Sequence, residues 1–167
     1  LMNGGQGAPL TPIFHKLLFK LTKKNSATFL NIGGISNETF INNDGKIFAK
    51  DVGPGNCLID KWIRSKSDKS FDKDGLIARS GKINIPILKN ALENYYSNYI
   101  RGKRSYDIND FDLSFIRGLS FEDGCATITD FTAYLISIGI KSVYNLSIKE
   151  DKKLFLCGGG RKNNFLM

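Results

Sequence analysis

The spacing of apolar residues first predicts a helix that begins at Pro9. Its apolar positions recur at intervals of four, three and four residues, at Leu10, Phe14, Leu17 and Leu21. That spacing places them on one face of a helix, and Pro9 and Pro12 are tolerated because both fall in its first turn. His15 follows Phe14 directly, and we expect this lone helical histidine to lie at the surface or to cap the helix rather than to act as a base.

The pattern then changes to short runs rich in β-branched and aromatic residues. The three runs are 27–32, 38–41 and 46–50. Gly33-Gly34 and Asp44-Gly45 separate them, and both dipeptides are typical of hairpin turns. The sequence therefore predicts a three-stranded antiparallel meander. A glycine turn at 53–55 closes it and leads into a helix that carries Leu58, Ile59 and Trp62.

The remaining pattern predicts two more helices and one more strand. Apolar positions mark a helix over 85–99, followed by an irregular stretch over 100–119. Ser120 and Asp123 form a possible capping box for a helix that is buried through Ile138. Residues 153–157 are expected to form a buried strand, which ends at Gly158-Gly159-Gly160 before a new helix starts at Asn163-Asn164.

This order of elements indicates the fold class. Antiparallel strands, helices, a further strand and a glycine loop fit neither a sandwich nor a doubly wound parallel sheet. They fit an α/β lobe of the ribonuclease-H-like (actin-like ATPase) type. We expect residues 1–167 to be a single lobe with a helical insertion at about 64–119, and to be incomplete at both ends.

Composition narrows the choice of partners. The chain has 167 residues and a formal charge of +8, which makes nucleotide phosphates and nucleic acid both eligible. Its basic residues are scattered as on a solvated surface, so we expect no nucleic-acid partner. No apolar run approaches the ~20 residues that a membrane helix needs, and no secretory leader is visible. The expected location is the cytoplasm, and the three separated cysteines are expected to be reduced core thiols.

Four glycine-bearing segments stand at the ends of predicted strands or helices. They are 4–10, 31–37, 51–56 and 157–163. Glycine lets backbone amides approach a phosphate or a sugar. Any one segment taken alone is more readily a plain tight turn, and the presence of four in one small domain favours a binding role. Neither a Walker loop nor a strand–GxGxxG–helix unit is present. The hairpin at Gly33-Gly34 suits the β- and γ-phosphates of ATP, whereas the bare backbone of Gly158 to Gly160 suits adenosine.

Six motifs in register carry a family resemblance. They are GGQGAPL, LNIGGISN, D-x-GPGN-x-x-x-D, FDKDG, ATxTxFTA and CGGG-x-x-N-x-x-LM, and together they span essentially the whole chain. The series resembles the anhydro-N-acetylmuramic acid kinases. These are bacterial enzymes that use ATP and water to open 1,6-anhydro-N-acetylmuramic acid and phosphorylate it during cell-wall recycling. The resemblance implies an actin, hexokinase and heat-shock ATPase type of fold, with ATP in a cleft between two lobes and Mg²⁺ assisting transfer.

The resemblance also assigns residues. It implies a phosphate site at Gly33, Gly34, Ser36 and Asn37. It implies an adenosine site at Gly158, Gly159, Gly160 and Asn163. It implies a sugar pocket bordered by Gly4, Gly5, Gln6, Gly7, Ala8 and Pro9. Asp51 is expected to face the metal through water.

The chain departs from the family pattern at several points. The catalytic aspartate of the family would immediately precede Leu1, and the first phosphate loop is absent. Val52 replaces a threonine, and a Pro-Pro-Lys-Ser stretch is reduced to the residues at 102–105; both changes are expected to weaken binding. We therefore expect no kinase activity from the chain alone. A separate chain carrying the N-terminal lobe and a homodimer are the partners considered, and a non-catalytic nucleotide-binding or partner-binding remnant is the alternative.

Overall fold

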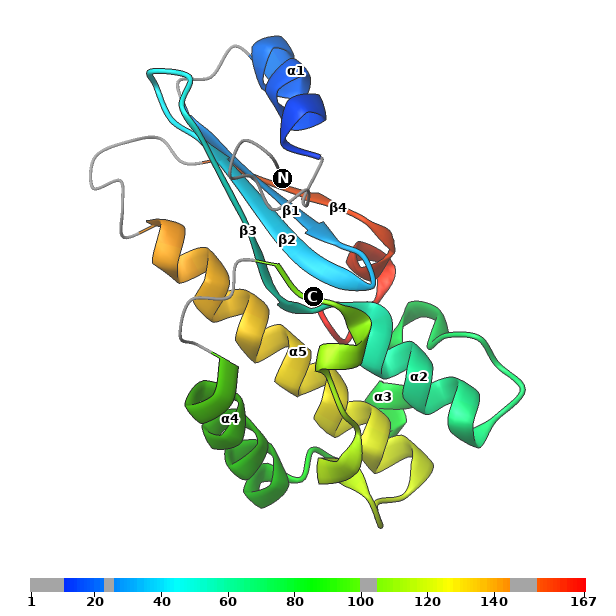
Figure 1. The fold of residues 1–167 in the computed structure, drawn as a ribbon. Coiled ribbons are helices and arrows are strands. Elements are labelled where there is room, and N and C mark those ends of the chain that lie inside the picture. Colours follow the sequence, from blue (N-terminus) through cyan, green and yellow to red (C-terminus); the bar gives the residue numbers. More distant parts are fainter. Residues whose placement is uncertain (1–10, 23–25, 100–104, 145–152) are drawn as a thin grey trace.

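A four-stranded mixed sheet organises the protein, with helices on both of its faces (Figure 1). The computed structural model describes residues 11–22, 26–99, 105–144 and 153–167. The strands are β1 (Ala27–Ile32), β2 (Ile35–Ile41), β3 (Ile47–Pro54) and β4 (Lys153–Cys157). Their order in the sheet is β3-β2-β1-β4, and β4 runs parallel to β1 whereas the other pairs are antiparallel.

One helix, α1 (Pro12–Thr22), precedes β1. The long connection that the parallel pair requires runs from β1 to β4. Besides β2 and β3 it contains α2 (Asn56–Lys66), α3 (Leu76–Ser80), α4 (Ile85–Tyr99) and α5 (Phe121–Tyr144). Four short 3₁₀ turns complete the described residues: η1 (Lys73–Gly75), η2 (Ile108–Asp110), η3 (Ser114–Ile116) and η4 (Gly159–Lys162). No helix within these described ranges is long and apolar enough to cross a bilayer.

The alternation of side chains along β1 explains why the sheet is covered on two sides. Leu30 and Ile32 pack against Ile136 of α5. Phe29 points to the opposite face, where Leu18 of α1 packs against its cluster. A two-residue period in a strand produces this division. The predicted meander is confirmed, because β1, β2 and β3 pair as consecutive antiparallel strands across the two predicted turns.

A second core joins the helices below the sheet. Cys125 and Ile128 of α5 are fully buried against α2, where Ile63 is also inaccessible. The indole nitrogen of Trp62 donates to the Phe121 carbonyl over 2.8 Å and fixes α2 against the start of α5. This core holds α2 rigidly below one end of the sheet, where the glycine turns lie.

The helix predicted near the N-terminus is present, but its predicted buried face is wrong. Phe14 and Leu17 are exposed, and Leu21 is 78% exposed. His15 is instead 3% exposed, so the expectation of a surface histidine is wrong as well. A hydrogen bond of 2.9 Å between its Nδ1 and the Thr39 hydroxyl orients α1 on the sheet. The contact between His15 and Thr39, and not the spacing of apolar residues, thus determines which face of α1 is buried.

The C-terminal part also differs from the prediction. The strand at 153–157 is present, but it is an edge strand with partly exposed side chains rather than a buried one. After Gly158 the chain forms the 3₁₀ turn η4 and a further turn, in place of the expected helix at Asn163-Asn164. Half of the predicted capping box is confirmed, because the Asp123 amide donates to the Ser120 hydroxyl at 3.1 Å. The Asp123 carboxylate accepts from the Lys82 amide at 2.7 Å.

Candidate functional site

Three glycine turns meet at one end of the sheet. Gly33-Gly34 joins β1 to β2, the turn at 53–55 joins β3 to α2, and the turn at 158–160 follows β4. Because β4 runs parallel to β1, with Cys157 opposite Asn31, both strands end at this edge. The sheet therefore brings together the residues predicted for the phosphates and those predicted for adenosine, although they lie far apart in the sequence.

Backbone hydrogen bonds connect the first two turns. The Gly55 amide donates to the Gly34 carbonyl at 2.9 Å, and the Asn56 amide donates to the Gly33 carbonyl at 2.7 Å. These bonds satisfy amides at the start of α2 that have no partner within a helix. The Gly33 and Gly34 amides themselves donate to no acceptor within the described part of the chain. Donors of this kind suit an anion.

Glycine is required by packing at some of these positions and not at others. A Cβ at Gly55 would lie 2.9 Å from the Ser36 hydroxyl oxygen. Gly158 has a φ of +84°, and a Cβ there would lie 2.6 Å from the side-chain oxygen of Asn31. Gly34 has nothing within 4 Å of the place where a Cβ would stand. Gly34 therefore faces open space, where a ligand could approach its amide.

The two polar side chains predicted for the phosphate site have internal partners. Ser36 is fully buried, and its hydroxyl donates to the Pro54 carbonyl at 3.3 Å. The side-chain oxygen of Asn37 accepts from the Thr11 hydroxyl at 3.4 Å. Phosphate contacts by these two side chains stay predictions, and the open backbone of the hairpin is the more accessible feature.

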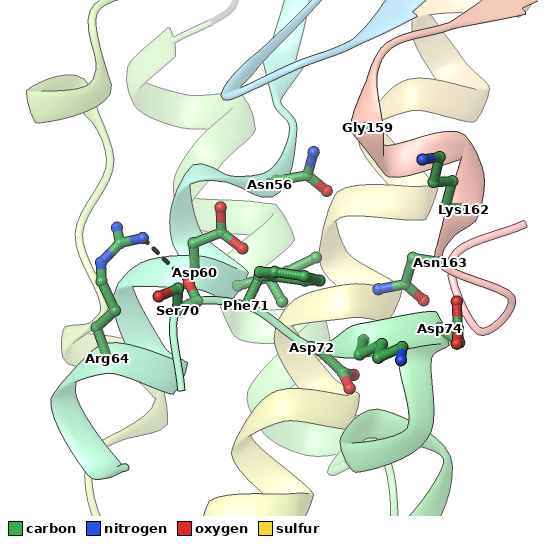
Figure 2. Close-up of a pocket in the computed structure, with 12 residues that line it drawn as sticks. Asn56, Asp60, Arg64, Ser70, Phe71, Asp72, Asp74, Gly159, Lys162 and Asn163 are labelled. Atoms are coloured by element: carbon green, nitrogen blue, oxygen red, sulfur yellow. Dashed lines mark hydrogen bonds between the residues drawn. The ribbon is translucent and has the colours of Figure 1, made fainter. Parts of the chain in front are cut away.

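A pocket of about 610 Å³ lies beside the turns, between α2, η1 and η4 (Figure 2). Its lining residues come from three separate segments: Asn56, Ile59, Asp60, Arg64, Ser70, Phe71, Asp72, Lys73, Asp74, Gly159, Lys162 and Asn163. Two of the four residues predicted for adenosine, Gly159 and Asn163, line it directly. Gly158 and Gly160 instead pack against Ile32, where added Cβ atoms would overlap the strand.

The side-chain oxygen of Asn163 makes hydrogen bonds within the fold, and its side-chain nitrogen faces the pocket. Its oxygen accepts from the Phe165 amide at 3.0 Å and from the Leu166 amide at 3.1 Å. Its nitrogen is directed into the pocket in Figure 2. Asn56 ties the same pocket to the sheet, because its side-chain nitrogen donates to the Ile32 carbonyl at 3.3 Å. Asn56 thus links the pocket to the end of β1, directly before the hairpin turn.

Charged side chains give the pocket a mixed wall. Burial raises the pKa of the Asp60 carboxyl above its ordinary value, and the nearby Arg64 guanidinium offsets part of that rise. Arg64 also donates to the Ser70 carbonyl at 3.2 Å. Lys73 and Lys162 stand on the other walls. Such a wall accommodates a ligand that has both anionic and hydrogen-bonding groups.

Asp51 lies within β3 and is paired with Asn37 of β2. Its Oδ2 accepts from the Tyr106 amide at 2.7 Å. Burial raises the pKa of the Asp51 carboxyl, and hydrogen bonds from Tyr106 and Ser105 oppose that rise. The described residues contain no cluster of three or more acidic, His or Cys side chains that could hold a metal. A single carboxylate fits Mg²⁺ only as a partner to phosphate and water ligands, so the metal role of Asp51 stays a prediction.

Two other sequence predictions are placed differently. Val52 is buried beneath α5 and contacts Gly139, so its side chain points away from the pocket. The expected loss of binding through a missing hydroxyl at this position stays a prediction. The sugar-pocket residues at 4–9 and most of the stretch at 102–105 lie outside the described residues.

Sequence reasoning missed most of the pocket wall. Arg64 and Lys162 were not singled out, and Phe71 and Asp60 stood within the family motifs without an assigned role. Nothing in a polar stretch shows that it folds back beside a distant glycine turn. The available signal was the motif at 71–75, in which an aromatic residue precedes alternating charges. Its function becomes visible once η1 is placed against η4.

Comparisons with known proteins identify the family of the chain. The model of the family described as anhydro-N-acetylmuramic acid kinase matches residues 1–167. The chain belongs to this family. It is 48% identical over 172 residues to the anhydro-N-acetylmuramic acid kinase of Pelagibacter ubique, covering 99% of this chain and 45% of that protein. It is 41% identical over 172 residues to the anhydro-N-acetylmuramic acid kinase of Rhizobium johnstonii, and the match covers 100% of this chain and 44% of that protein.

The chain thus spans about 45% of the length of the Pelagibacter relative. Among solved structures, the activator of the 2-hydroxyisocaproyl-CoA dehydratase from Clostridium difficile with bound ADPNP overlays with a TM-score of 0.45 and 13% identity. That overlay covers 84% of this chain and 48% of the activator. The α/β lobe expected from the sequence is confirmed by the sheet topology and by the family match.

Proposed function

We propose that this chain is the nucleotide-binding lobe of an enzyme that phosphorylates 1,6-anhydro-N-acetylmuramic acid with ATP. One observation carries the proposal. The open Gly33-Gly34 hairpin and the η4 turn meet at one end of the sheet, beside a pocket of about 610 Å³. Family membership supplies the reaction, and this geometry supplies a place for its nucleotide.

The chain's own residues divide the work of binding. The amides of Gly33 and Gly34 face the β- and γ-phosphates, and Gly159 with Asn163 faces the adenosine. Positioned backbone donors stabilise the charge that phosphoryl transfer spreads over the phosphate oxygens. Mg²⁺, when bound with ATP, neutralises phosphate charge, and Asp51 would hold it through water. The sugar would border the segment at 4–9.

The isolated chain binds nucleotide but does not turn it over. In-line transfer needs a group that activates water and donors on the far side of the phosphates. The family's catalytic aspartate and first phosphate loop are not among residues 1–167. A separate chain with the N-terminal lobe would supply both, and a cytoplasmic location suits a recycled sugar substrate.

Binding at the hairpin is tested with two matched glycine substitutions. Gly34→Asp adds a carboxylate where a Cβ meets nothing within 4 Å, so the fold tolerates it. Two like charges near 4 Å repel strongly at a protein surface, and the affinity for ADP should fall roughly tenfold or more. Gly45→Asp is the control for the added charge, because Gly45 also has nothing within 4 Å of its Cβ position and lies in the β2–β3 turn at the opposite end of the sheet. Its φ of +72° strains a side chain there, so the folding of this variant is checked by urea unfolding before the titration.

Titration calorimetry with ADP measures both variants against the unchanged chain. Equal affinity in the unchanged chain and in Gly34→Asp would count against the phosphate site. ADP release in the presence of 1,6-anhydro-N-acetylmuramic acid then tests the reaction. The chain alone should show none, and the chain mixed with the missing family segments should show sugar-dependent release. Nucleotide binding without release in the mixture would favour the non-catalytic alternative.

A further inference from the structure

Phe71 presents an aromatic ring inside the pocket. It is the one aromatic residue among the described residues that line this pocket, and its side chain lies in the middle of the view in Figure 2. The residue is 57% exposed, although both of its chain neighbours also line the pocket. A large apolar side chain gains free energy when it is buried, so this ring has surface left for a ligand.

The backbone on both sides of Phe71 is fixed. The Ser70 carbonyl accepts from Arg64 at 3.2 Å. Asp72 is buried and accepts from the Ile77 amide at 2.8 Å and from the Ala78 amide at 3.0 Å. These bonds hold the segment against α2 and α3, so the main chain keeps the ring at the pocket instead of letting it withdraw into the core.

The η4 side of the pocket has bare backbone at one residue, beside the polar side chains of Lys162 and Asn163. Gly159 lines the same pocket and carries no side chain, and Asn163 directs its nitrogen inward beside it (Figure 2). A flat group between Phe71 and this wall would have an aromatic face on one side and a polar donor at its edge. Stacking platforms for nucleobases have this composition.

The position of Asn56 indicates the direction in which a nucleotide would lie in the site. Its side chain lines the pocket and donates to the carbonyl of Ile32, the residue that precedes the open Gly33-Gly34 turn. Phosphates at the hairpin would therefore continue past Asn56 into the pocket. The end of the ligand that reaches Phe71 is the nucleoside and not the phosphate.

We infer that Phe71 is the stacking residue for the base of a bound nucleotide. The inference rests on the proposed function and adds to it the residue that separates a nucleotide from a bare polyphosphate. Every nucleobase has a π face, so stacking tolerates the identity of the base. Phe71 should then contribute equally to the binding of adenine and guanine nucleotides and nothing to the binding of pyrophosphate.

The test compares ligands with and without a base. ADP, GDP and pyrophosphate are titrated into the unchanged chain and into Phe71→Ala, Phe71→Leu and Phe71→Tyr. Loss of one stacked base weakens binding about 5-fold to 150-fold. Phe71→Ala and Phe71→Leu should lose that factor for ADP and GDP alike and keep their affinity for pyrophosphate. Phe71→Tyr retains a ring and should stay within about threefold of the unchanged chain.

Phe48→Ala is the matched control, because Phe48 is 53% exposed but lies on β3, outside the pocket lining. It should leave the affinity for all three ligands unchanged. Unaltered ADP affinity in folded Phe71→Leu would overturn the inference while leaving the proposed function intact. An equal loss for ADP and pyrophosphate would also overturn it, since the residue would then only support the loop. Absence of ADP binding to the unchanged chain would overturn the proposed function, and the inference with it.

Discussion

His15 is the residue whose replacement should most clearly separate the sequence expectation from the structure. Its imidazole stacks on Phe29, with ring centroids 4.8 Å apart and planes 10° from parallel. Its Nδ1 and the hydroxyl of Thr39 are hydrogen-bonded at 2.9 Å. Phe29 stacks in turn on Phe155 of β4 at 5.0 Å. His15 thus anchors α1 to β1 and β2, and Phe29 extends the stack to β4.

The expected cost follows from these contacts. His15→Phe keeps a ring against Phe29, but leaves the fully buried Thr39 hydroxyl without its partner, which costs about 1–3 kcal/mol of unfolding free energy. His15→Ala also removes the stack and leaves a cavity, for a total of about 3–5 kcal/mol. Thr39→Val added to His15→Phe should restore part of the loss, because replacing both partners with apolar groups can be nearly neutral.

The contribution of His15 should also depend on pH. Burial lowers the pKa of the His15 imidazole below its ordinary value of about 6.5. The unfolded chain therefore takes up a proton at a pH where the folded chain does not. Stability from this group is full above about pH 6.5 and falls as the pH drops toward the folded pKa, by at most about 1.4 kcal/mol per pH unit.

Urea unfolding of the unchanged chain and of His15→Phe, from pH 5 to pH 8, measures both effects. Burial raises the pKa of the Glu38, Asp51, Asp60 and Asp130 carboxyls, and these groups contribute an opposite pH dependence to both proteins. The difference between the two proteins removes that background. The advantage of the unchanged chain should shrink at low pH. A constant difference, or equal stability at pH 8, would refute the assignment of His15 as a buried neutral anchor.

Three further substitutions test the frame of the site. Gly55→Ala places a methyl group on the Gly33 carbonyl, so ADP affinity should fall with a loss of about 1–3 kcal/mol in stability, measured by calorimetry and urea unfolding. Asp72→Asn replaces one of the two oxygens that accept hydrogen bonds from the Ile77 and Ala78 amides. It should lower the free energy of unfolding by about 1–3 kcal/mol and weaken ADP binding. Trp62→Phe removes the indole bond to Phe121 and should cost about 1–3 kcal/mol without a comparable change in ADP affinity.

Local chemistry made the sheet and its turns predictable. Gly33-Gly34 and Asp44-Gly45 are turn signals that act over a few residues, and β1, β2 and β3 pair across them as expected. The cap at Ser120 is equally local. The glycine segments could also be recognised as candidate binding turns, because glycine has no side chain and leaves its backbone accessible to a ligand.

Long-range contacts made the rest unpredictable. Contacts with Thr39 and Phe29 determine which face of α1 is buried. The spacing of apolar residues within the helix does not reveal these contacts. Exposure of β4 depends on its place at the edge of the sheet. The pocket requires η1 to fold against η4, where the Asn164 amide donates to the Asp74 carbonyl at 3.3 Å. Such contacts join segments about ninety residues apart.

The motif around Asp51 shows how packing and function can occupy alternate residues of one strand. Because side chains alternate in a strand, Asp51 faces the side of the sheet that carries Tyr106, whereas Val52 faces α5. Gly139 matches Val52, since a Cβ there would overlap the valine side chain. Val52 is therefore a packing residue opposite a glycine. The contribution of residues 51–56 to the site comes from Gly55, whose lack of a side chain lets the hairpin and α2 approach.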